Sequence, residues 1–533
     1  MLSRKEMLRS MAALPVGGYL AGKLGLAESI GRPGASLGPT ADSIYRSVGA
    51  KPLINARGTV TIIGATRVLP EVQEAMDRAV REYVQLDELM EGVGERLGAL
   101  TGTEFGMVSA GASAAITAAT AGIISGGDPD RIWQLPDLSG LKNEVIIPTY
   151  SRSAYDAAAR AVGATMVPVA DVQELEAALG PRTAMVMVLA SGRSNDGPLS
   201  LREISERAHA SGVPVLVDAA AEELRVPNPH IEQGADLVAY SGGKSLRGPQ
   251  CAGLLIGRKD LVWASWISVA PHHGFGRGFK VGREEIMGML AAVETWFTRD
   301  HDAEQARWLA WLEQIAQQAG SIRGVETEVR PAGDRLSNRY PGLTISWDRD
   351  RIDLAGHEME QALWDGDPGI AVSGAGSFLP FPPNEQPAIR INVSQMEEWE
   401  VSIVADRVRD VLENPPSINR ERQAPAEDLS GQWDLVLSFS ASDVDQTLTF
   451  QQEGAELLGT HFASFADRDL AGYLSGREIL FRSSYTGEGV RLNYTFTGTI
   501  DGDTMHGDVC MGEYGTASWR AKRRVYRPAG RRG

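Results

Sequence analysis

One lysine follows an apolar run in the segment from Ala239 to Gln250, which reads AYSGGKSLRGPQ. The run predicts a strand that ends at Tyr240, and the small residues after it allow a ligand to approach the backbone closely. In open α/β sheets, ligands bind at the carboxyl ends of the strands. Lys244 at such an edge could form an imine with an aldehyde. A lone lysine after a strand can equally be a solvated surface residue, so the interpretation depends on other segments.

Two segments nearer the N-terminus carry groups that would complement this lysine. An apolar strand from Val213 ends in Asp218, and a carboxylate there could pair with a protonated pyridine nitrogen. The alternative is that Asp218 caps the segment after it. A small-residue turn before an expected helix offers free backbone N–H groups to a phosphate, through Gly111, Ala112 and Ser113. Ser241 could add a hydroxyl to the same phosphate.

These segments must be positioned by a sheet, because short buried runs alternate with helical patterns from about residue 41 to 297. The expected strands are Phe105 to Val108, Glu144 to Ile147, Ala184 to Leu189, Val213 to Val217, Leu237 to Tyr240 and Gly253 to Ile256. The expected helices include Ala114 to Ile124, Ala154 to Val162 and Leu201 to Ala210. Alternation of this kind predicts an α/β domain with a mostly parallel sheet covered on both faces.

The rest of the chain predicts further domains. Residues 298–413 suggest a smaller α+β domain with helices around Ala303 to Ala319 and Glu397 to Leu412. A linker rich in proline and charge, 414–430, precedes a β-rich region at 431–525, expected to be a small antiparallel barrel or sandwich. Its opening Gly431-Gln432-Trp433 resembles the start of lipocalin-like barrels, so the region either binds a ligand or is an accessory domain. A basic tail, 526–533, follows.

Composition limits the function classes. The net charge of −17 works against generic binding to nucleic acid, and no run approaches the roughly 20 apolar residues of a membrane span. Cys251 and Cys510 lack metal-ligand spacing, so no metal is expected. Within residues 1–40, Ser3 to Leu8 and the apolar stretch Met11 to Leu26 resemble a twin-arginine export signal in which Lys5 replaces the second arginine. A retained amphipathic helix is the alternative, so an exported, periplasmic location and a cytoplasmic one both stay open.

The order of these motifs resembles fold-type I enzymes that use pyridoxal 5'-phosphate (PLP). Within them it resembles the group of bacterial selenocysteine synthase (seryl-tRNA selenium transferase) and D-glucosaminate-6-phosphate ammonia-lyase. The similarity spans roughly residues 45–415 and does not cover the β-rich region. The segments that carry it are 54–60, 100–104, 143–145, 217–223, 234–237, Lys244 with Gly248-Pro249, and 276–284.

The resemblance implies PLP as the cofactor, with Lys244 as its Schiff-base lysine and Asp218 as the partner of the pyridine nitrogen. It implies a phosphate site at Gly111, Ala112, Ser113 and Ser241. Arg152 or Tyr155 would lie against the cofactor face, and Arg390 would clamp a substrate carboxylate unless it forms a structural ion pair. Arg277 and Lys280 would meet the cofactor or substrate of a neighbouring subunit, or else be solvated loop charges. The family's habit also implies a homodimer or larger homo-oligomer.

The chemistry expected is loss of the α-proton of an amino acid or amino-sugar acid, with Lys244 as the base. Elimination of a β-substituent, as in an ammonia-lyase, is the leading hypothesis, and transamination and racemisation start from the same carbanion. Selenium transfer to seryl-tRNA is the main enzymatic alternative. It is disfavoured by the acidic charge, by the export-like N-terminus and by the lack of an evident basic module before residue 45. A PLP-fold scaffold with a ligand-binding β-domain is the alternative that involves no catalysis.

Overall fold

The computed structural model describes residues 43–334, 339–375, 386–418, 421–487 and 490–524. The chain divides into two compact units, Met1–Pro52 and Leu53–Gly533. In the first, a short 3-10 helix, η1 (Ile44–Val48), ends at Gly49. The predicted export signal lies outside the described residues, as does the predicted basic tail. No helix among the described residues is long and apolar enough to cross a membrane.

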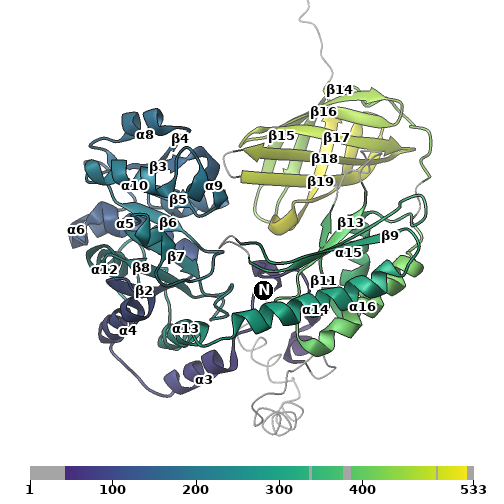
Figure 1. The fold of residues 1–533 in the computed structure, drawn as a ribbon. Helices are drawn as coiled ribbons and strands as arrows, with labels where there is room; N and C mark the ends of the chain where they lie inside the picture. Colours follow the sequence, from purple (N-terminus) through teal and green to yellow (C-terminus); the bar gives the residue numbers. More distant parts are fainter. Residues whose placement is uncertain (1–42, 335–338, 376–385, 419–420, 488–489, 525–533) are drawn as a thin grey trace, which may run out of the picture. The chain divides into compact units, whose positions relative to one another are not determined.

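A seven-stranded sheet forms the centre of the second unit, in the order β2-β8-β7-β6-β5-β3-β4 (Figure 1). Five neighbouring strands are parallel, and only β8 runs antiparallel to its two neighbours. The bounds are β2 (Phe105–Ser109), β3 (Glu144–Pro148), β4 (Thr165–Val169), β5 (Thr183–Leu189), β6 (Val215–Asp218), β7 (Leu237–Ser241) and β8 (Gly253–Gly257). This mostly parallel sheet confirms the predicted α/β fold.

The six predicted strands are present because their apolar runs are buried on both faces. β4 was not predicted, since it lies at the edge of the sheet, contains Pro168 and buries only Val169 fully. The helices that accompany the sheet are α3 (Pro70–Ala79), α4 (Leu86–Thr101), α5 (Ala112–Ser125), α6 (Pro129–Gln134), α8 (Val172–Ala178), α9 (Gly192–Asp196), α10 (Leu201–Ala210), α11 (Pro229–Glu232), α12 (Lys259–Ile267) and α13 (Arg283–Trp296). The helix expected over Ala154 to Val162 is instead η4 (Ala154–Asp156) followed by α7 (Ala157–Arg160).

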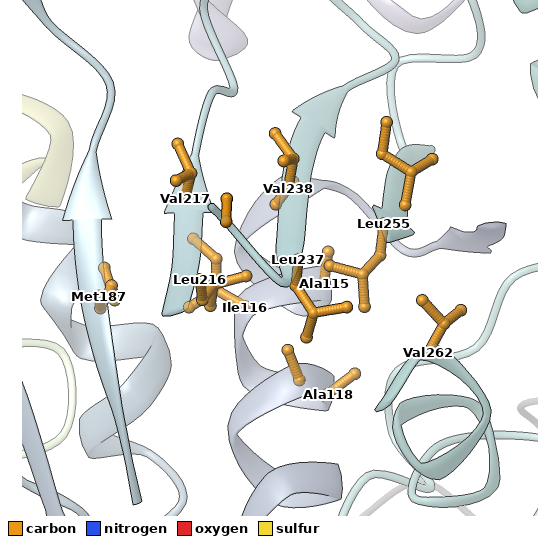
Figure 2. Close-up of a cluster of buried hydrophobic side chains, with 14 of the residues drawn as sticks. Ala115, Ile116, Ala118, Met187, Leu216, Val217, Leu237, Val238, Leu255 and Val262 are labelled. Atoms are coloured by element: carbon orange, nitrogen blue, oxygen red, sulfur yellow. The ribbon is translucent and has the colours of Figure 1, made fainter. Parts of the chain in front are cut away.

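The position of α5 is fixed by its small residues. Figure 2 shows Ala115, Ile116 and Ala118 of α5 against the side chains of β6, β7 and β8. A Cβ atom at Gly122 would lie 2.6 Å from the backbone nitrogen of Ser265 in α12, so the two helices are in backbone contact. Close packing on both sides holds the N-terminus of α5 at a defined place on the sheet edge.

The α+β part contains a four-stranded antiparallel sheet in the order β12-β13-β10-β9 and a parallel pair, β1 and β11. Its strands are β1 (Leu53–Asn55), β9 (Val325–Arg330), β10 (Gly342–Trp347), β11 (Gly369–Ala371), β12 (Ser373–Ala375) and β13 (Ala388–Ile391), and its helices are α14 (His301–Gly320), α15 (Gly356–Asp365) and α16 (Glu398–Glu413). The long helices α14 and α16 pack together, and their apolar faces share a core with the sheet (Figure 1). Both predicted helices are therefore present.

The β-rich region is a closed antiparallel barrel of eight strands, which decides between the barrel and the sandwich expected from the sequence (Figure 1). The strands are β14 (Gly431–Ser438), β15 (Asp443–Glu453), β16 (Glu456–Phe462), β17 (Asp467–Ser475), β18 (Glu478–Gly487), β19 (Val490–Asp501), β20 (Thr504–Cys510) and β21 (Thr516–Arg523). Trp433 is buried, donates a hydrogen bond from Nε1 to the carbonyl of Leu429, and lies under the guanidinium of Arg523. The lipocalin-like opening thus anchors one end of the barrel.

Candidate active site

Strand register brings the predicted cofactor segments to one edge of the sheet. Gly253, the first residue of β8, pairs with Ser109 at the end of β2 and with Ser241 at the end of β7. Asp218, the last residue of β6, pairs with Ala239, two residues before Ser241. The carboxyl ends of β2, β6 and β7 therefore place the α5 turn, the aspartate and the lysine loop together, where ligands bind in such sheets.

The loop around Lys244 is compact and needs its glycines. Gly242 donates to the carbonyl of Ala252 at 2.9 Å and accepts from the amide of Gly248 at 2.8 Å. A Cβ atom at Gly242 would lie 2.7 Å from that Ala252 oxygen, and one at Gly243 would lie 2.8 Å from the Cα of Gln250. Real Cβ atoms essentially never approach that closely, so the two glycines let the loop fold back on itself and hold Lys244 at the sheet edge.

Asp218 is only 2% exposed, and its carboxylate accepts a hydrogen bond from the amide of Ala220 at 3.0 Å. Burial raises the pKa of the Asp218 carboxyl, while the Ala220 amide and the positive charge of Lys244 oppose that rise and Glu222 adds to it. Burial lowers the pKa of Lys244, against the attraction of Asp218. A buried carboxylate and a partly desolvated amine thus influence each other's charge, which is an arrangement suited to proton transfer.

The α5 turn has the backbone shape of an anion site. Gly111 precedes the helix with a φ of 95°, and the first amide of the helix ladder belongs to Ala115, which bonds to the Gly111 carbonyl at 2.9 Å. The amides before it in the first turn have no partner within the helix and carry the positive end of its dipole. Ala112 is buried and Ser113 is exposed. A Cβ atom at Gly253 would meet the carbonyl carbon of Gly111 at 2.4 Å, so β8 lies directly against this turn.

Behind Asp218 lies a buried pair that the sequence did not reveal as such. Nε2 of His230 is 2.5 Å from a carboxylate oxygen of Glu222, and both side chains are less than 5% exposed. Asn228 caps α11 through the amides of His230 and Ile231 and donates to the hydroxyl of Tyr240 at 2.9 Å. The pair fixes the chain between β6 and the lysine loop, because Ser245 also donates to the Glu222 carbonyl at 3.1 Å.

Arginines gather beside Ser245, and their grouping was also missed. Arg299 donates to the Ser245 carbonyl at 3.0 Å and pairs with Glu304, and Arg339 pairs with Glu223 at 2.9 Å. Arg247 has a φ of 53°, a strained value for a residue with a side chain. Burial, followed by repulsion from Arg299, lowers the pKa of Arg247. These residues come from segments far apart in the sequence, and only the strained loop brings them together.

The candidates for the cofactor face and for the substrate take different positions. Arg152 is half-buried, and its Nε lies 2.5 Å from Asp156, whereas Tyr155 is 55% exposed. The segment before them is held to the sheet edge by the Ser151 hydroxyl, which accepts from the amide of Leu189 at the end of β5. Arg152 therefore has a fixed orientation near this edge, and Tyr155 is solvent-facing in the single chain.

Arg390, Arg277 and Lys280 are all exposed in the single chain. Arg390 lies on β13, where it pairs with Thr344 of β10 and Ser373 of β12 on the less buried face of that sheet. Arg277 and Lys280 occupy a loop held by a bridge between Gly276 and Val269 and by hydrogen bonds between its own backbone groups. The contacts of the single chain therefore leave the predicted substrate roles of all three residues as predictions.

Taken together, the described residues fit PLP. They offer a lysine of lowered pKa, a buried carboxylate for a ring nitrogen, and a glycine-edged helix start for a phosphate, all on one sheet edge. Among the described residues no group of three or more histidine, cysteine or acidic side chains is arranged to hold a metal ion. The fold and this edge define a fold-type I PLP-dependent enzyme, and the aminotransferase class-V family model matches residues 155–266.

The comparisons narrow that class. D-glucosaminate-6-phosphate ammonia lyase of Salmonella typhimurium is 30% identical over 385 residues, covering 70% of this chain and 98% of the relative. The chain belongs to the family of this ammonia lyase. A solved structure of a D-glucosaminate-6-phosphate ammonia-lyase superposes with a TM-score of 0.61 at 28% identity, covering 70% of this chain and 99% of that one.

Other relatives carry other names. A 5'-C-glycyluridine monooxygenase-decarboxylase from Streptomyces is 31% identical and covers 53% of this chain and 72% of the relative. An L-seryl-tRNA(Sec) selenium transferase of Rhizobium meliloti is 28% identical and covers 63% of this chain and 71% of the relative. Both groups named from the sequence motifs are thus confirmed as relatives. Their different reactions mean that this chain's reaction has to be argued from the site.

Proposed function

We propose that this protein is a PLP-dependent lyase that removes ammonia from an amino-sugar acid by α,β-elimination. The observation that carries the proposal is that Lys244 and Asp218 lie together at the sheet edge. Burial lowers the pKa of Lys244, and the Asp218 carboxylate lies close enough to oppose that lowering. Lowering the pKa of an amine leaves more of it unprotonated at a given pH, and abstraction of an α-proton requires an unprotonated base. The substrate class follows the ammonia lyase, whose length this chain covers almost completely.

In this proposal Lys244 Nζ would hold the cofactor through its aldehyde, Asp218 would pair with the ring nitrogen, and the α5 turn with Ser241 would hold the phosphate. Arg152 or Tyr155 contacts the ring face. When bound, PLP supplies an electron sink for the negative charge that develops at the substrate α-carbon. Every other step depends on proton transfers and on binding by the residues of the chain.

Lys244 Nζ would remove the α-proton of the bound substrate and could return it to the departing β-hydroxyl. The net change at this stage is loss of water across the bond between the α- and β-carbons. Hydrolysis of the carbon–nitrogen bond then consumes one water and releases ammonia, leaving a keto acid. Asp218 would act on the ring side only, so the proton transfers at the substrate would fall to Lys244.

Positive charge is available for an acidic substrate. Arg299 and Arg339 border a small internal space of about 20 Å³ next to Ser245, roughly room for one water molecule. We propose that Arg390 clamps the substrate carboxylate. The roles of Arg277 and Lys280 are proposed for a neighbouring subunit in a homo-oligomer.

The decisive experiment measures ammonia and keto-acid release from cofactor-loaded protein supplied with D-glucosaminate, its 6-phosphate and D-serine. Equal amounts of ammonia and keto acid without an added acceptor are expected, and K244A should abolish both. Release that requires a keto-acid acceptor would instead indicate transamination, and tight, salt-sensitive binding of serine tRNA would indicate a selenium transferase. An intact PLP absorbance band with no turnover of any amino acid would favour the scaffold alternative.

A further inference from the structure

The inside of the barrel is apolar near the linker and carries several polar side chains at the opposite end. Near the linker, inward positions carry residues such as Phe450, Leu457 and Ile479. At the opposite end, where the hairpins β14–β15, β16–β17 and β20–β21 turn, the inward side chains include Gln446, His461, Arg468 and Ser483. Small barrels usually fill their interior with apolar side chains, so a charged group there calls for an explanation.

Arg468 is the unusual member of this polar end. It is only 4% exposed, it pairs across the strands with His461, and its guanidinium carbon lies 4.1 Å from the centre of the Tyr494 ring. Its Nε and Nη1 atoms are buried and have no hydrogen-bond partner. Those two nitrogens carry three of the five N–H donors of the side chain. No salt bridge joins Arg468 to a carboxylate within the described ranges.

The groups around Arg468 do not neutralise it. His461 uses both ring nitrogens, with Nδ1 2.7 Å from the Ser483 hydroxyl and Nε2 2.6 Å from the Gln446 carbonyl oxygen. Burial, followed by the charge of Arg468, lowers the pKa of His461 to about 3, so the imidazole is neutral at physiological pH. Asp467 and Asp469, the neighbours along β17, lie on the exposed outer face of the strand.

A buried guanidinium without a counter-charge is costly, and removal of its donors from water adds to the cost. A stacked tyrosine compensates only part of it, since a ring offers a quadrupole and no acceptor for the N–H groups. An anion supplied from outside would satisfy both the charge and the donors. One unpaired positive charge among neutral neighbours corresponds to a ligand with one negative charge.

We infer that the barrel binds a small monocarboxylate, with the carboxylate against Arg468 and polar substituents toward Gln446 and Ser483. The Phe481 and Phe496 rings are stacked at 4.4 Å and fill the interior below this level, so the rest of the ligand extends toward the hairpin end. Phe465 is 62% exposed between β16 and β17, and its ring contacts Tyr485 at 5.7 Å. These two rings give the ligand an apolar surface at that end. This site is separate from the proposed lyase function and does not depend on it.

The test uses the full-length, cofactor-loaded protein and three probes: sodium lactate, sodium gluconate and sodium benzoate, at constant ionic strength set with sodium chloride. Binding is measured by saturation-transfer NMR and by calorimetric titration. In R468M, which removes the charge but keeps an unbranched apolar chain, the affinity for the best probe should fall at least tenfold. R520M is the matched control, because Arg520 lies on β21 with a 60% exposed side chain and should leave binding unchanged.

A carboxylate could also bind at the catalytic edge, so R390M is included. Binding that survives in R390M and is lost in R468M supports the barrel site, and the reverse pattern overturns it. Equal affinity in R468M and the parent protein, or no binding of any probe to the parent, would mean that water alone solvates Arg468, and the inference would be wrong. If R468M does not fold, R468K keeps the charge without the fork and should bind the best probe more weakly than the parent.

Discussion

Replacing Gly253 by alanine tests whether the α5 turn holds the cofactor phosphate. The added Cβ would lie 2.4 Å from the carbonyl carbon of Gly111 and 2.6 Å from the amide nitrogen of Ala112. Real Cβ atoms stay at 3.0 Å or more from such atoms. Since 3.0 minus 2.4 is 0.6, β8 and the turn would have to move apart by at least 0.6 Å. Both atoms are backbone, and α5 is held from behind by α12, so no side chain can move aside to absorb the shift.

The magnitude follows from the hydrogen bonds at risk. An amide that donates to a charged phosphate contributes about 1.5–3 kcal/mol, so misplacing one such amide should raise the Kd for PLP roughly 10- to 150-fold. Overpacking should also lower the free energy of unfolding by about 1–3 kcal/mol. We expect both effects in G253A.

The assay is titration of cofactor-free protein with PLP, followed by absorbance, alongside urea unfolding of the same samples. G180A is the control, because a Cβ at Gly180 would meet nothing within 4 Å and its φ is ordinary. G180A should therefore match the parent in both measurements. If G253A bound PLP as tightly as G180A, the turn at Gly111 would not be the phosphate site, however well its geometry suits one.

Further substitutions test the charges at the same edge. K244A should lose the absorbance band near ~420 nm and lower elimination by roughly 10²–10⁴-fold, and retention of either property would exclude Lys244 as attachment point or base. Burial lowers the pKa of Lys244, so between that lowered pKa and 10.5 the unfolded chain binds more protons than the folded one. Over this pH range the unfolding free energy of the cofactor-free protein, measured relative to that of K244M, should therefore rise with pH. A difference that stays constant with pH would contradict this. D218N should reduce turnover more than D218E does, measured at saturating PLP, because only the glutamate keeps a charge for the ring nitrogen; equal rates would remove Asp218 from the mechanism. Burial alone would raise the pKa of Glu304, but hydrogen bonds from His301 and Arg299 lower it to about 2, so the stability that Glu304 contributes is present above 4.5 and lost as the pH falls toward 2. The unfolding free energy of E304Q should therefore lie below that of the parent by up to about 3 kcal/mol at pH 6, with the gap falling to less than half by pH 3 and closing only near pH 2.

The sequence predicted a structural element correctly where the residues of that element alone show a clear pattern. Six strands of the central sheet could be predicted because each is a run buried on both faces, and the order of Gly111, Asp218 and Lys244 along the chain identified the fold type. β4 gave no such signal, because an edge strand with a proline and mixed exposure does not differ from a loop by pattern. The arginines around Ser245 gave none either: Arg299 and Arg339 reach it from positions 54 and 94 residues away.

The sequence predicted helices and strands, but it could not predict which charged side chains pair with one another. The buried ion pairs show why. Arg299 has Glu304, Arg152 has Asp156, and Arg67 has the fully buried Glu400, which lies 333 residues away in the sequence. In β17, strand alternation turns Arg468 into the barrel together with Leu470, yet that alternation carries no information on whether a carboxylate faces the guanidinium. Because a lone buried charge is expensive, a buried ionisable group with incomplete pairing is a place where a ligand has much to supply, and the described residues include two such groups. Asp218 is one, since the Ala220 amide and Lys244 are the neighbours that lower its pKa, and in the proposed function the ring nitrogen of PLP would complete its pairing. Arg468 is the other, and the same reasoning that assigns a cation to the first assigns a carboxylate to the second.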